Sequence, residues 1–470
     1  MAQEQHFDVA IIGAGLAALA AGIRLAHFGR KVCLFERHNV VGGLNSYYAI
    51  AGRKFDVGLH AITNFVPRER RGSPLNRILR QLRIDRDALD LCPQLRSVVR
   101  FPGVELPFTN DFAVLETGVA AAFPSQIDGF RRLVAEIRNF DDASFSPPAL
   151  GARELIRRHV ADRALEDLLL CPLLFYGSAQ EGDMDAIQFV IMFKSIFLEG
   201  LARPFEGIRV VLRLLTERLR ECGGERRMKC GVVRLRTAGD CVTALELENG
   251  DTVTAKTVLS SAGAVETARL CGATEAATAG EVGRLSFVEA IQVLRRLPRD
   301  LGWADTIVFF NDRPQFEYAQ PRVPVDVRSG VICFPNNFAF GGRQPGEGSV
   351  RTTCLANFAQ WAGMTADRYR QEKNRWFAEM VTSTRRFLPP VETAVLAAET
   401  VATDMFTPTT VRRFTGHLGG AIYGAPTKSR DGRTPFTNLF LIGTDQGFLG
   451  ITGSMLSGIT MANLHVLQVR

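Results

Sequence analysis

The sequence predicts an α/β fold in which a Rossmann-like domain, built on a parallel sheet, is interleaved with a second domain of the α+β class. Three observations predict it. A strand–turn–helix–strand unit occupies residues 7–36, three short strands follow one another over residues 228–262, and a last strand and helix fill residues 437–470. Because the intervening linkers are short, we expect the parts of the first domain to be separated in sequence and joined in space.

The N-terminal unit is predicted from changes in the hydrophobic pattern. Residues 7–12 form an apolar strand, residues 16–28 are small and apolar as in a buried helix, and residues 31–35 form a second apolar strand that ends at Glu36. The glycines lie in the turn between the first strand and the helix. A strand, a crossover helix and a parallel strand make one βαβ unit.

The middle of the chain is predicted to be mainly helical. Three stretches are assigned by spacing: a helix over residues 75–90, short strands and turns over 91–125, and helices over 128–222 with breaks at 144–152 and Pro204. The last of these helices, residues 208–222, places its apolar side chains on one face. It ends at Gly223 and Gly224, a common C-terminal cap.

The C-terminal half returns to strands. We predict strands at residues 228–236, 241–248 and 252–262, Phe-rich strands over 285–360, a helix over 365–388, a strand within 437–446 and a helix from about Gly453. Asn249 and Gly250 predict a hairpin turn between two of the strands. The Rossmann-like domain then comprises residues 1–110, 208–280 and 401–470, with a helical region at 111–207 and a sheet region at 281–400.

Composition limits the function classes. The 470 residues carry a net charge of +7, spread along the chain, so we expect no nucleic-acid partner, whereas an anionic membrane surface is compatible. The nine cysteines form no CxxC pair and the seven histidines show no ligand spacing, which predicts reduced thiols and no metal. From the pattern of the given sequence we expect neither a signal peptide nor a membrane-spanning stretch, which would need ~20 apolar residues. We expect a cytoplasmic protein, soluble or peripheral on the inner face of the membrane, and leave the oligomeric state open.

The turn after the first strand predicts a dinucleotide site. In GAGLAA, Gly13 permits a tight turn, Gly15 lets a phosphate approach the backbone, and Ala18 stands at the third glycine position of the fingerprint. The helix that follows directs its positive end, at Leu16 and Ala17, toward the pyrophosphate. Glu36 is eighteen residues beyond Ala18, where a carboxylate can bind ribose hydroxyls. These features alone fit NAD or FAD.

Two further segments favour FAD. Glu36 is followed after five residues by Gly42 and Gly43, an arrangement that resembles flavoproteins such as amine oxidases and phytoene desaturases. The strand before GTDQGFLGITGSM is predicted to bring a carboxylate and a helix N-terminus to the flavin. The other residues predicted to bind FAD in these two segments are Arg37, Leu44, Asn45, Gly443, Asp445, Gly453, Ser454 and Met455.

The chain as a whole resembles the family of phytoene desaturases, carotenoid isomerases and retinol saturases, which are flavoproteins of the GR2 type with an amine-oxidase-like fold. Four stretches carry the resemblance: FDVGLHAITN (55–64), the helix–strand–hairpin run over 208–262, TPTTVRRFTGHLGGAIYG (407–424) and GRTPFTNLFLIG (432–443). The resemblance implies that Val232 and Val233 lie at the adenine. Leu59 and Glu206 depart from the family pattern, in which proline and glycine are usual.

The resemblance implies an FAD-dependent desaturase or isomerase acting on C–C or C=C bonds of a long apolar isoprenoid, such as a carotenoid precursor. Alternatives are a squalene-pathway dehydroxylase or polyene saturase, a flavin amine oxidase, and a non-catalytic flavin-binding redox sensor. Phe-rich segments, 189–193, 195–199, 334–340 and 355–358, are expected to wall an apolar substrate site. Residues 186–202 with Arg203 and the arginines of 209–220 fit either a buried helix pair or an apolar, basic-rimmed entrance that faces a membrane.

Catalytic residues are predicted from position alone. His60 lies in the segment expected beside the flavin and is able to exchange a proton near neutral pH. Arg412 lies in the Arg-rich stretch ahead of the YG motif and could hold charge near the flavin. No Ser-His-Asp or paired-carboxylate arrangement is apparent in the sequence.

Overall fold

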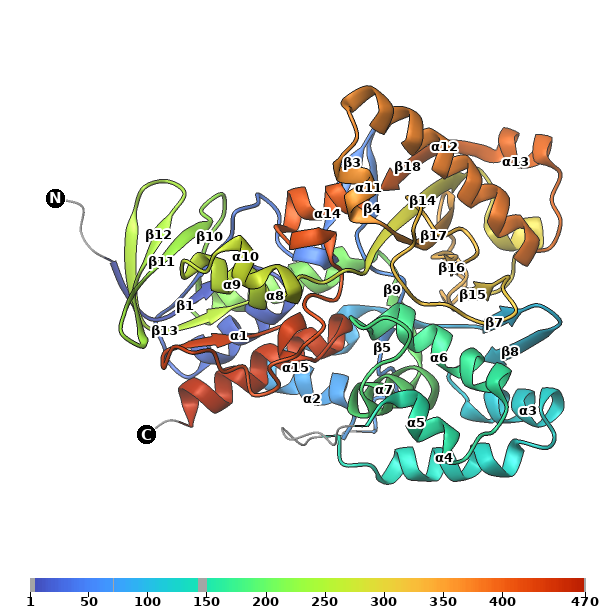
Figure 1. Ribbon diagram of the computed structural model, residues 1–470, viewed down its shortest axis with the longest axis horizontal. Helices are drawn as coiled ribbons and strands as arrows, with labels where there is room; N and C mark the ends of the chain where they lie inside the picture. Colours follow the sequence, from blue (N-terminus) through green and yellow to red (C-terminus); the bar gives the residue numbers. More distant parts are fainter. Residues whose placement is uncertain (1–4, 71, 143–149, 469–470) are drawn as a thin grey trace.

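The computed structural model describes residues 5–70, 72–142 and 150–468, and two seven-stranded sheets organise this part of the chain (Figure 1). The first sheet contains, in order, β10 (Glu225–Arg227), β2 (Val32–Phe35), β1 (Gln5–Ile12), β13 (Thr252–Ser260), β12 (Cys241–Leu247) and β11 (Val232–Ala238), with β19 (Leu439–Leu441) also paired to β13. β10, β2, β1, β13 and β19 are parallel neighbours. The predicted Rossmann-like unit is confirmed.

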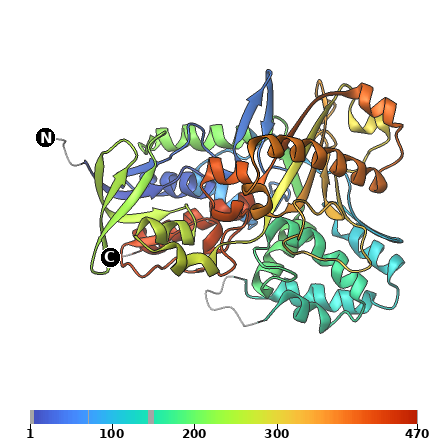
Figure 2. The same cartoon turned by 45° about the horizontal axis from the view of Figure 1, so that its top comes forward.

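The second sheet is mostly antiparallel. Its order is β18 (Thr400–Phe406), β14 (Ser286–Leu294), β17 (Gly348–Ala356), β16 (Ser329–Cys333), β15 (Ile307–Asn311), β7 (Ser97–Phe101) and β8 (Val104–Phe108). Smaller pairings join β3 (Tyr47–Ile50) to β4 (Arg53–Asp56), and β9 (Leu201–Pro204) to β5 (Ile62–Thr63) and β6 (Leu91–Pro93). Figure 2 shows the β3–β4 hairpin projecting from the body of the molecule.

Helices cover both sheets. Their bounds are α1 (Leu16–His27), α2 (Pro74–Leu82), α3 (Phe112–Ala122), α4 (Ile127–Asn139), α5 (Ala152–Arg157), α6 (Arg163–Gly177), α7 (Ala186–Phe193), α8 (Ile208–Glu221), α9 (Ala264–Leu270), α10 (Glu275–Thr278), α11 (Phe358–Ala362), α12 (Ala366–Thr384), α13 (Thr393–Glu399), α14 (Pro408–Thr415) and α15 (Gly450–Ala462). Side chains alternate between the faces of each sheet. In β15, Phe309 therefore packs against the helices α5 to α7, while Phe310 packs toward α12.

Small residues let α1 pack closely between its neighbours. A Cβ at Gly458 of α15 would lie 2.0 Å from the Ala17 carbonyl oxygen, and a Cβ at Gly22 would lie 2.8 Å from Leu34. Longer side chains at these positions would push α1 away from the sheet. The alanine-rich sequence after the glycine turn is thus explained by packing.

Two element predictions are wrong in part. The helix predicted over 75–90 ends at Leu82, because Arg83 adopts a left-handed conformation with φ of 54°. The region 128–222, predicted to be helical, contains β9 at Leu201–Pro204, since Pro204 and its neighbours pair with β5 and β6. The predicted break at 144–152 lies largely outside the described residues. The division into the five predicted segments remains a prediction.

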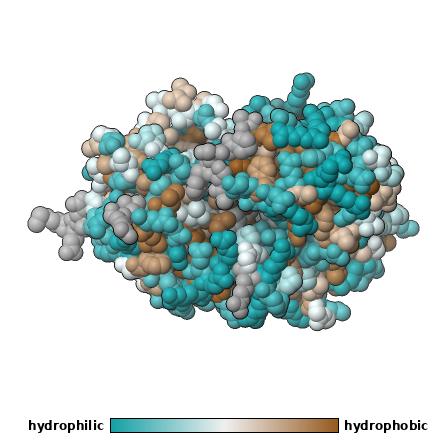
Figure 3. Space-filling view, turned by 90° about the horizontal axis from the view of Figure 1, so that it is seen from below, coloured by the Kyte–Doolittle hydropathy of each residue, from teal (hydrophilic) through white to brown (hydrophobic). Residues whose placement is uncertain are grey.

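The stretch 186–202 does not face a membrane. Phe189, Phe193 and Phe197 are at most 2% exposed and belong to the core beneath the second sheet, and Arg203 is buried in an ion pair with Asp56. Of the two alternatives for this stretch, the structure favours the buried one over a membrane-facing entrance, because the apolar face already packs against protein. On the face shown in Figure 3, hydrophobic residues lie in separate patches among hydrophilic ones. None of the described helices is both long and apolar enough to span a bilayer.

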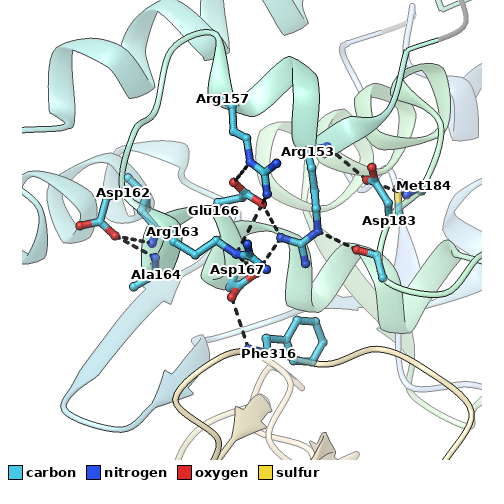
Figure 4. Close-up of polar contacts among 12 residues, drawn as sticks. Arg153, Arg157, Asp162, Arg163, Ala164, Glu166, Asp167, Asp183, Met184 and Phe316 are labelled. Carbon is cyan, nitrogen blue, oxygen red and sulfur yellow. Dashed lines mark hydrogen bonds and ion pairs between the residues drawn. The ribbon is translucent and has the colours of Figure 1, made fainter.

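An ion network around two buried carboxylates fastens the helical region to the second sheet (Figure 4). Glu166 and Asp167 of α6 are each 2% exposed. Arg153 of α5 lies 2.7 Å from Asp167 Oδ1 and also pairs with Glu166, and Arg157 Nε lies 2.7 Å from Glu166 Oε2. The other oxygen of Asp167 accepts a hydrogen bond from the backbone N–H of Phe316, in the loop after β15. These contacts place α5 and α6 against that loop.

Candidate functional site

One cavity of about 850 Å³ lies beyond the carboxyl ends of the parallel strands. Ligands of open α/β sheets bind at this edge. Most of the predicted site residues line it: Gly13, Gly15, Leu16, Ala17, Glu36, Arg37, Gly42, Gly43, Leu44, Asn45, His60, Val232, Val233, Gly443 and Ser454. The fold therefore gathers residues from three distant parts of the sequence around one space.

The glycine turn presents backbone to this cavity. Gly13 has φ of +95°, and a Cβ there would lie 2.4 Å from Ser261 Oγ, so only glycine fits without strain. Gly15 has φ of −72°, and nothing lies within 4 Å of the point that a Cβ at this residue would occupy. The first N–H groups of a helix have no intrahelical partner, and those of α1 begin directly after Gly15. An anionic group can approach here without meeting a side chain.

Glu36 and the paired glycines shape the adjoining wall. The Glu36 carboxylate accepts hydrogen bonds of 2.8 Å from the N–H groups of Ala14 and His38. Each carboxylate oxygen has a second lone pair able to accept a hydroxyl. Gly42 has φ of +112°, and its N–H donates to the Ala14 carbonyl at 2.9 Å, which fastens the loop to the turn. This wall suits the ribose and pyrophosphate of a dinucleotide.

Some predicted residues do not line the cavity. Ala18 is fully buried within the packing of α1, and Met455 packs in the same core. Gly453 lies against Phe448. Arg412 is exposed on α14, and its guanidinium lies 5.7 Å from the centre of the Phe358 ring. The structure thus places Arg412 away from the site that holds His60.

Asp445 is engaged by the protein itself. One carboxylate oxygen accepts the Ala264 N–H at 2.6 Å, and the other accepts the Ala425 N–H at 2.8 Å and lies 3.1 Å from Lys428 Nζ. The side chain is 2% exposed and does not line the cavity. Asp445 therefore holds three chain segments in position beneath the site. The helix that follows begins at Gly450, three residues before the predicted start, and Ile451 as well as Ser454 reaches the cavity.

His60 is held by a buried charge network. Its Nε2 lies 3.0 Å from Glu289 Oε1 and 3.1 Å from Thr353 Oγ1. Glu289 is paired with Arg351 through two hydrogen bonds of 2.9 and 2.5 Å. Arg351 also donates to the carbonyl oxygens of Asp56 and Leu59. The arginine thus fixes both the partner of His60 and the backbone that carries it.

The protonation states follow from this environment. Burial lowers the pKa of the His60 imidazole below its usual value of 6.5 and outweighs the hydrogen bond to Glu289. Burial raises the pKa of the Glu289 carboxyl, but the charge of Arg351 and the hydrogen bond from His60 outweigh it and bring the pKa to about 2. His60 is therefore neutral and Glu289 ionised at pH 7. Because an ionised carboxylate only accepts hydrogen bonds, the ring proton is on Nε2.

The Phe-rich segments are not substrate walls. Phe189, Phe193, Phe334 and Phe338 are at most 1% exposed and lie in closed hydrophobic cores, and none lines the cavity. These phenylalanines pack between the sheets and the helices. Composition alone cannot distinguish a phenylalanine in a core from one in the wall of a ligand site. From these segments, Met192 alone among the described residues reaches the cavity.

The cavity-lining residues that also pack with the helical core beneath the second sheet are Ala61, Tyr176, Met192, Ile422 and Tyr423; together with His60, whose ring centre lies 5.9 Å from that of Tyr176, they are here called the inner end of the cavity. Sequence reasoning missed Tyr176, since nothing in its helical surroundings marks it. Tyr423 stands in the YG motif that carried the resemblance, and that motif could have identified it. The Tyr423 hydroxyl donates to the Phe175 carbonyl at 2.5 Å.

Other lining residues were also missed. Ser261, Ala262, Glu266 and Arg269 follow β13 and line the cavity, and the small-residue run at the end of this strand was the available signal. Within residues 5–70, 72–142 and 150–468, no three His, Cys, Asp or Glu side chains come together as a metal site would require.

The sequence comparison decides the family. The model of the family described as flavin containing amine oxidoreductase matches residues 16–464. The chain belongs to this family. It is also 27% identical over 264 residues to the phytoene dehydrogenase of Streptomyces griseus, covering 50% of each chain. With the prolycopene isomerase of Daucus carota it shares 19% identity over 293 residues, 56% of this chain and 47% of that one. The chain spans about half the length of these curated relatives.

Solved structures agree on the fold. An oxidoreductase from Methanosarcina mazei has a TM-score of 0.65 and 16% identity, covering 96% of this chain and 99% of its own. Putrescine oxidase bound to putrescine has a TM-score of 0.64 and 16% identity, covering 99% and 100%. The predicted amine-oxidase-like fold is confirmed, as is FAD as the cofactor of this flavin-containing family member. The open Gly15, the Glu36 carboxylate and the helix start at α1 fit its dinucleotide part.

Proposed function

We propose that this FAD-dependent oxidoreductase acts on a C–C or C=C bond of an apolar isoprenoid. The observation that carries the proposal is the uncharged character of the inner end. Ala61 and Met192 are apolar, His60 is neutral, and the carboxylate of Glu289 is neutralised by Arg351. The relatives named phytoene desaturase and prolycopene isomerase support an isoprenoid substrate.

FAD, when bound, supplies two-electron chemistry at its isoalloxazine ring. The chain's own residues then have three tasks. Ala61 and Met192 provide apolar surface that excludes water from a hydrocarbon chain. His60 retains its proton at Nε2, where Glu289 accepts it, and is held in one orientation by that hydrogen bond. Arg351 holds the segment 56–60 in place through its carbonyl oxygens.

The amine oxidase alternative is favoured by one observation, the pair of tyrosines at the inner end, since aromatic rings attract cations. It is opposed by the absence of an unpaired carboxylate among the described residues that line this end. Burying an ammonium group there would cost several kcal/mol.

The test is an anaerobic incubation of the flavin-loaded protein, in liposomes, with phytoene, cis-lycopene, squalene, hydroxysqualene and retinol, followed by chromatography. A parallel aerobic incubation with an amine panel that includes putrescine measures peroxide. We expect a changed isoprenoid and no amine-dependent peroxide. Peroxide from an amine with every isoprenoid unchanged would overturn the proposal, and bleaching by dithionite alone would indicate a redox sensor.

A further inference from the structure

The β3–β4 hairpin, which projects from the body of the molecule in Figure 2, forms one wall of the cavity. Tyr47, Tyr48 and Ile50 of β3 line the cavity, and so do Asp404 and Phe406 of β18, which Tyr48 contacts. Among the described strands, β3 and β4 pair only with each other. An isolated two-stranded hairpin is at best marginally stable. Contacts with the rest of the protein therefore keep this wall in place.

The base of the hairpin is firmly anchored. Its last residue, Asp56, is buried in an ion pair with Arg203 and accepts the Ile208 N–H at 3.2 Å. The Asp56 carbonyl also accepts a hydrogen bond of 2.8 Å from Arg351. Tyr47, which pairs with Asp56 across the hairpin, packs against the core of the first domain. Breaking a buried ion pair is strongly unfavourable, so the base stays fixed.

Beyond the base, two side-chain contacts hold the hairpin to the second sheet and its loops. Tyr48 Oη donates to Asp404 Oδ2 at 2.8 Å, and the Tyr48 ring lies 5.0 Å from the Phe406 ring. Nearer the tip, Arg53 Nη2 and Nε lie 2.7 and 2.9 Å from the two carboxylate oxygens of Glu347. Among the described residues, no backbone hydrogen bond links this part of the hairpin to another element.

These two contacts are weaker than those of the base. The ion pair is partly exposed, with 33% of the Arg53 side chain and 42% of the Glu347 side chain accessible, and such pairs contribute little and are screened by salt. Ile50 lines the cavity and is 49% exposed, so the cavity lies directly behind the tip. A ligand that passes between the tip and β18 needs only these two contacts to break.

We propose that the hairpin beyond its base is a gate through which an apolar ligand enters the cavity. When the gate is closed, both side-chain contacts are made; when it is open, both are broken and the hairpin bends away from β18 on its fixed base. Ile50, Phe406 and the Tyr48 ring provide apolar surface along this route, which suits an apolar ligand. The inference goes beyond the proposed function, because it concerns the route into the cavity and not the reaction.

The first test measures gate opening without a substrate. Ala61→Cys places a thiol on the cavity wall of the flavin-loaded protein, and peptide mass spectrometry follows its alkylation by N-ethylmaleimide. In this background we expect Tyr48→Phe to raise the alkylation rate about tenfold, because it removes a hydrogen bond to a charged group. Tyr369→Phe removes a hydroxyl that bonds to Thr407, and since neither residue lines the cavity the rate should not change.

The ion pair gives a second test, in which a general loss of stability would not produce the expected pattern. Arg53→Glu should raise the alkylation rate about threefold, and the addition of Glu347→Arg should restore the original rate. Added NaCl should raise the rate with Arg53 present and not in Arg53→Gln, because the reagent is uncharged. Equal rates in all variants, or no restoration in the double variant, would overturn the gate.

Stopped-flow binding of retinol, followed through quenching of its emission by the flavin, connects the gate to the proposed function. Opening precedes both entry and exit, so Tyr48→Phe should raise the association and dissociation rate constants by the same factor and leave the dissociation constant unchanged. A rise in the dissociation rate constant alone would show that Tyr48 only contacts the ligand, and the gate would be wrong. If putrescine binds and retinol does not, the proposed function fails, while the alkylation rates still decide the gate.

Discussion

At the scale of single residues, the two glycines of the first turn have different tasks. Gly13 is required by the fold, because its φ is positive and a Cβ would collide with Ser261. Gly15 is required only by a ligand, because its φ is ordinary and a Cβ would enter open space.

Substitution separates these tasks. Gly13→Ala should lower the free energy of unfolding by at least about 1–2 kcal/mol through backbone strain. Gly15→Ala should leave the unfolding free energy of the flavin-free protein within about 0.5 kcal/mol of wild type and still prevent flavin retention. Urea unfolding of the flavin-free variants measures the change in unfolding free energy. The flavin-to-protein absorbance ratio of the purified variants measures flavin retention. Normal flavin content in Gly15→Ala would show that the pyrophosphate does not pass this residue.

Glu36 gives a second residue-scale prediction. Its carboxylate is nine-tenths buried against the turn and faces the cavity. Glu36→Arg replaces two accepting oxygens with a donor and leaves the Ala14 and His38 N–H groups unpaired, so we expect the flavin content of the purified protein to fall at least tenfold. Glu379→Arg, on the exposed face of α12, makes the same charge change and should retain flavin. Equal flavin in both variants would remove Glu36 from the site.

At the scale of elements, the α5–α6 region depends on its ion network. Asp167 joins Arg153 to the backbone of Phe316 and is 2% exposed. Asp167→Ala should cost about 1–3 kcal/mol of unfolding free energy, because it leaves the backbone N–H of Phe316 without its acceptor and Arg153 with Glu166 alone. Glu154→Ala removes only an exposed pair with Arg158 and should change stability by less than about 0.5 kcal/mol. Thermal and urea unfolding measure the stability of both variants. If Asp167→Ala and Glu154→Ala lose similar amounts of unfolding free energy, the contacts of Asp167 contribute no more than an exposed ion pair.

At the scale of the whole molecule, Glu289 links His60, Arg351 and the segment 56–60 across the second sheet. Its pKa is about 2 in the folded state and about 4.5 when unfolded. A lowered folded-state pKa contributes stability that is complete above pH 4.5 and is lost as the pH falls toward 2. Glu289→Gln should therefore be less stable than wild type at pH 7 by about 3 kcal/mol.

That difference should shrink as the solution becomes more acidic. Urea unfolding at pH 7, 5, 4 and 3 measures the difference in unfolding free energy between wild type and Glu289→Gln. We expect this difference to narrow below pH 4.5. A gap that stays constant across this range would mean that Glu289 is not ionised in the folded protein. Control measurements on Glu379→Gln, an exposed carboxylate, should show no gap at any pH.

The sequence by itself determined the first domain and most of its dinucleotide site. Backbone conformation and local contacts determine the roles of the glycine turn, Glu36 and the Gly42–Gly43 pair. Such constraints involve residues close together in sequence, so a short sequence pattern can predict them. The same holds for the hairpin at Asn249–Gly250. Local patterns did not predict elements whose partners are distant in sequence. β9 pairs with strands that lie more than one hundred residues away, and the helical pattern of the residues around it gave no sign of a strand.

Only the tertiary structure decided the chemistry of the inner end. Asp445 was predicted to reach the flavin, but it bonds to segments around residues 264 and 425 and lies outside the cavity wall. The phenylalanines expected to bind substrate are packed in cores, whereas Tyr176, inconspicuous in sequence, reaches the cavity. Whether a side chain packs, pairs or faces a ligand depends on which residues lie across from it, and those residues come from other parts of the chain.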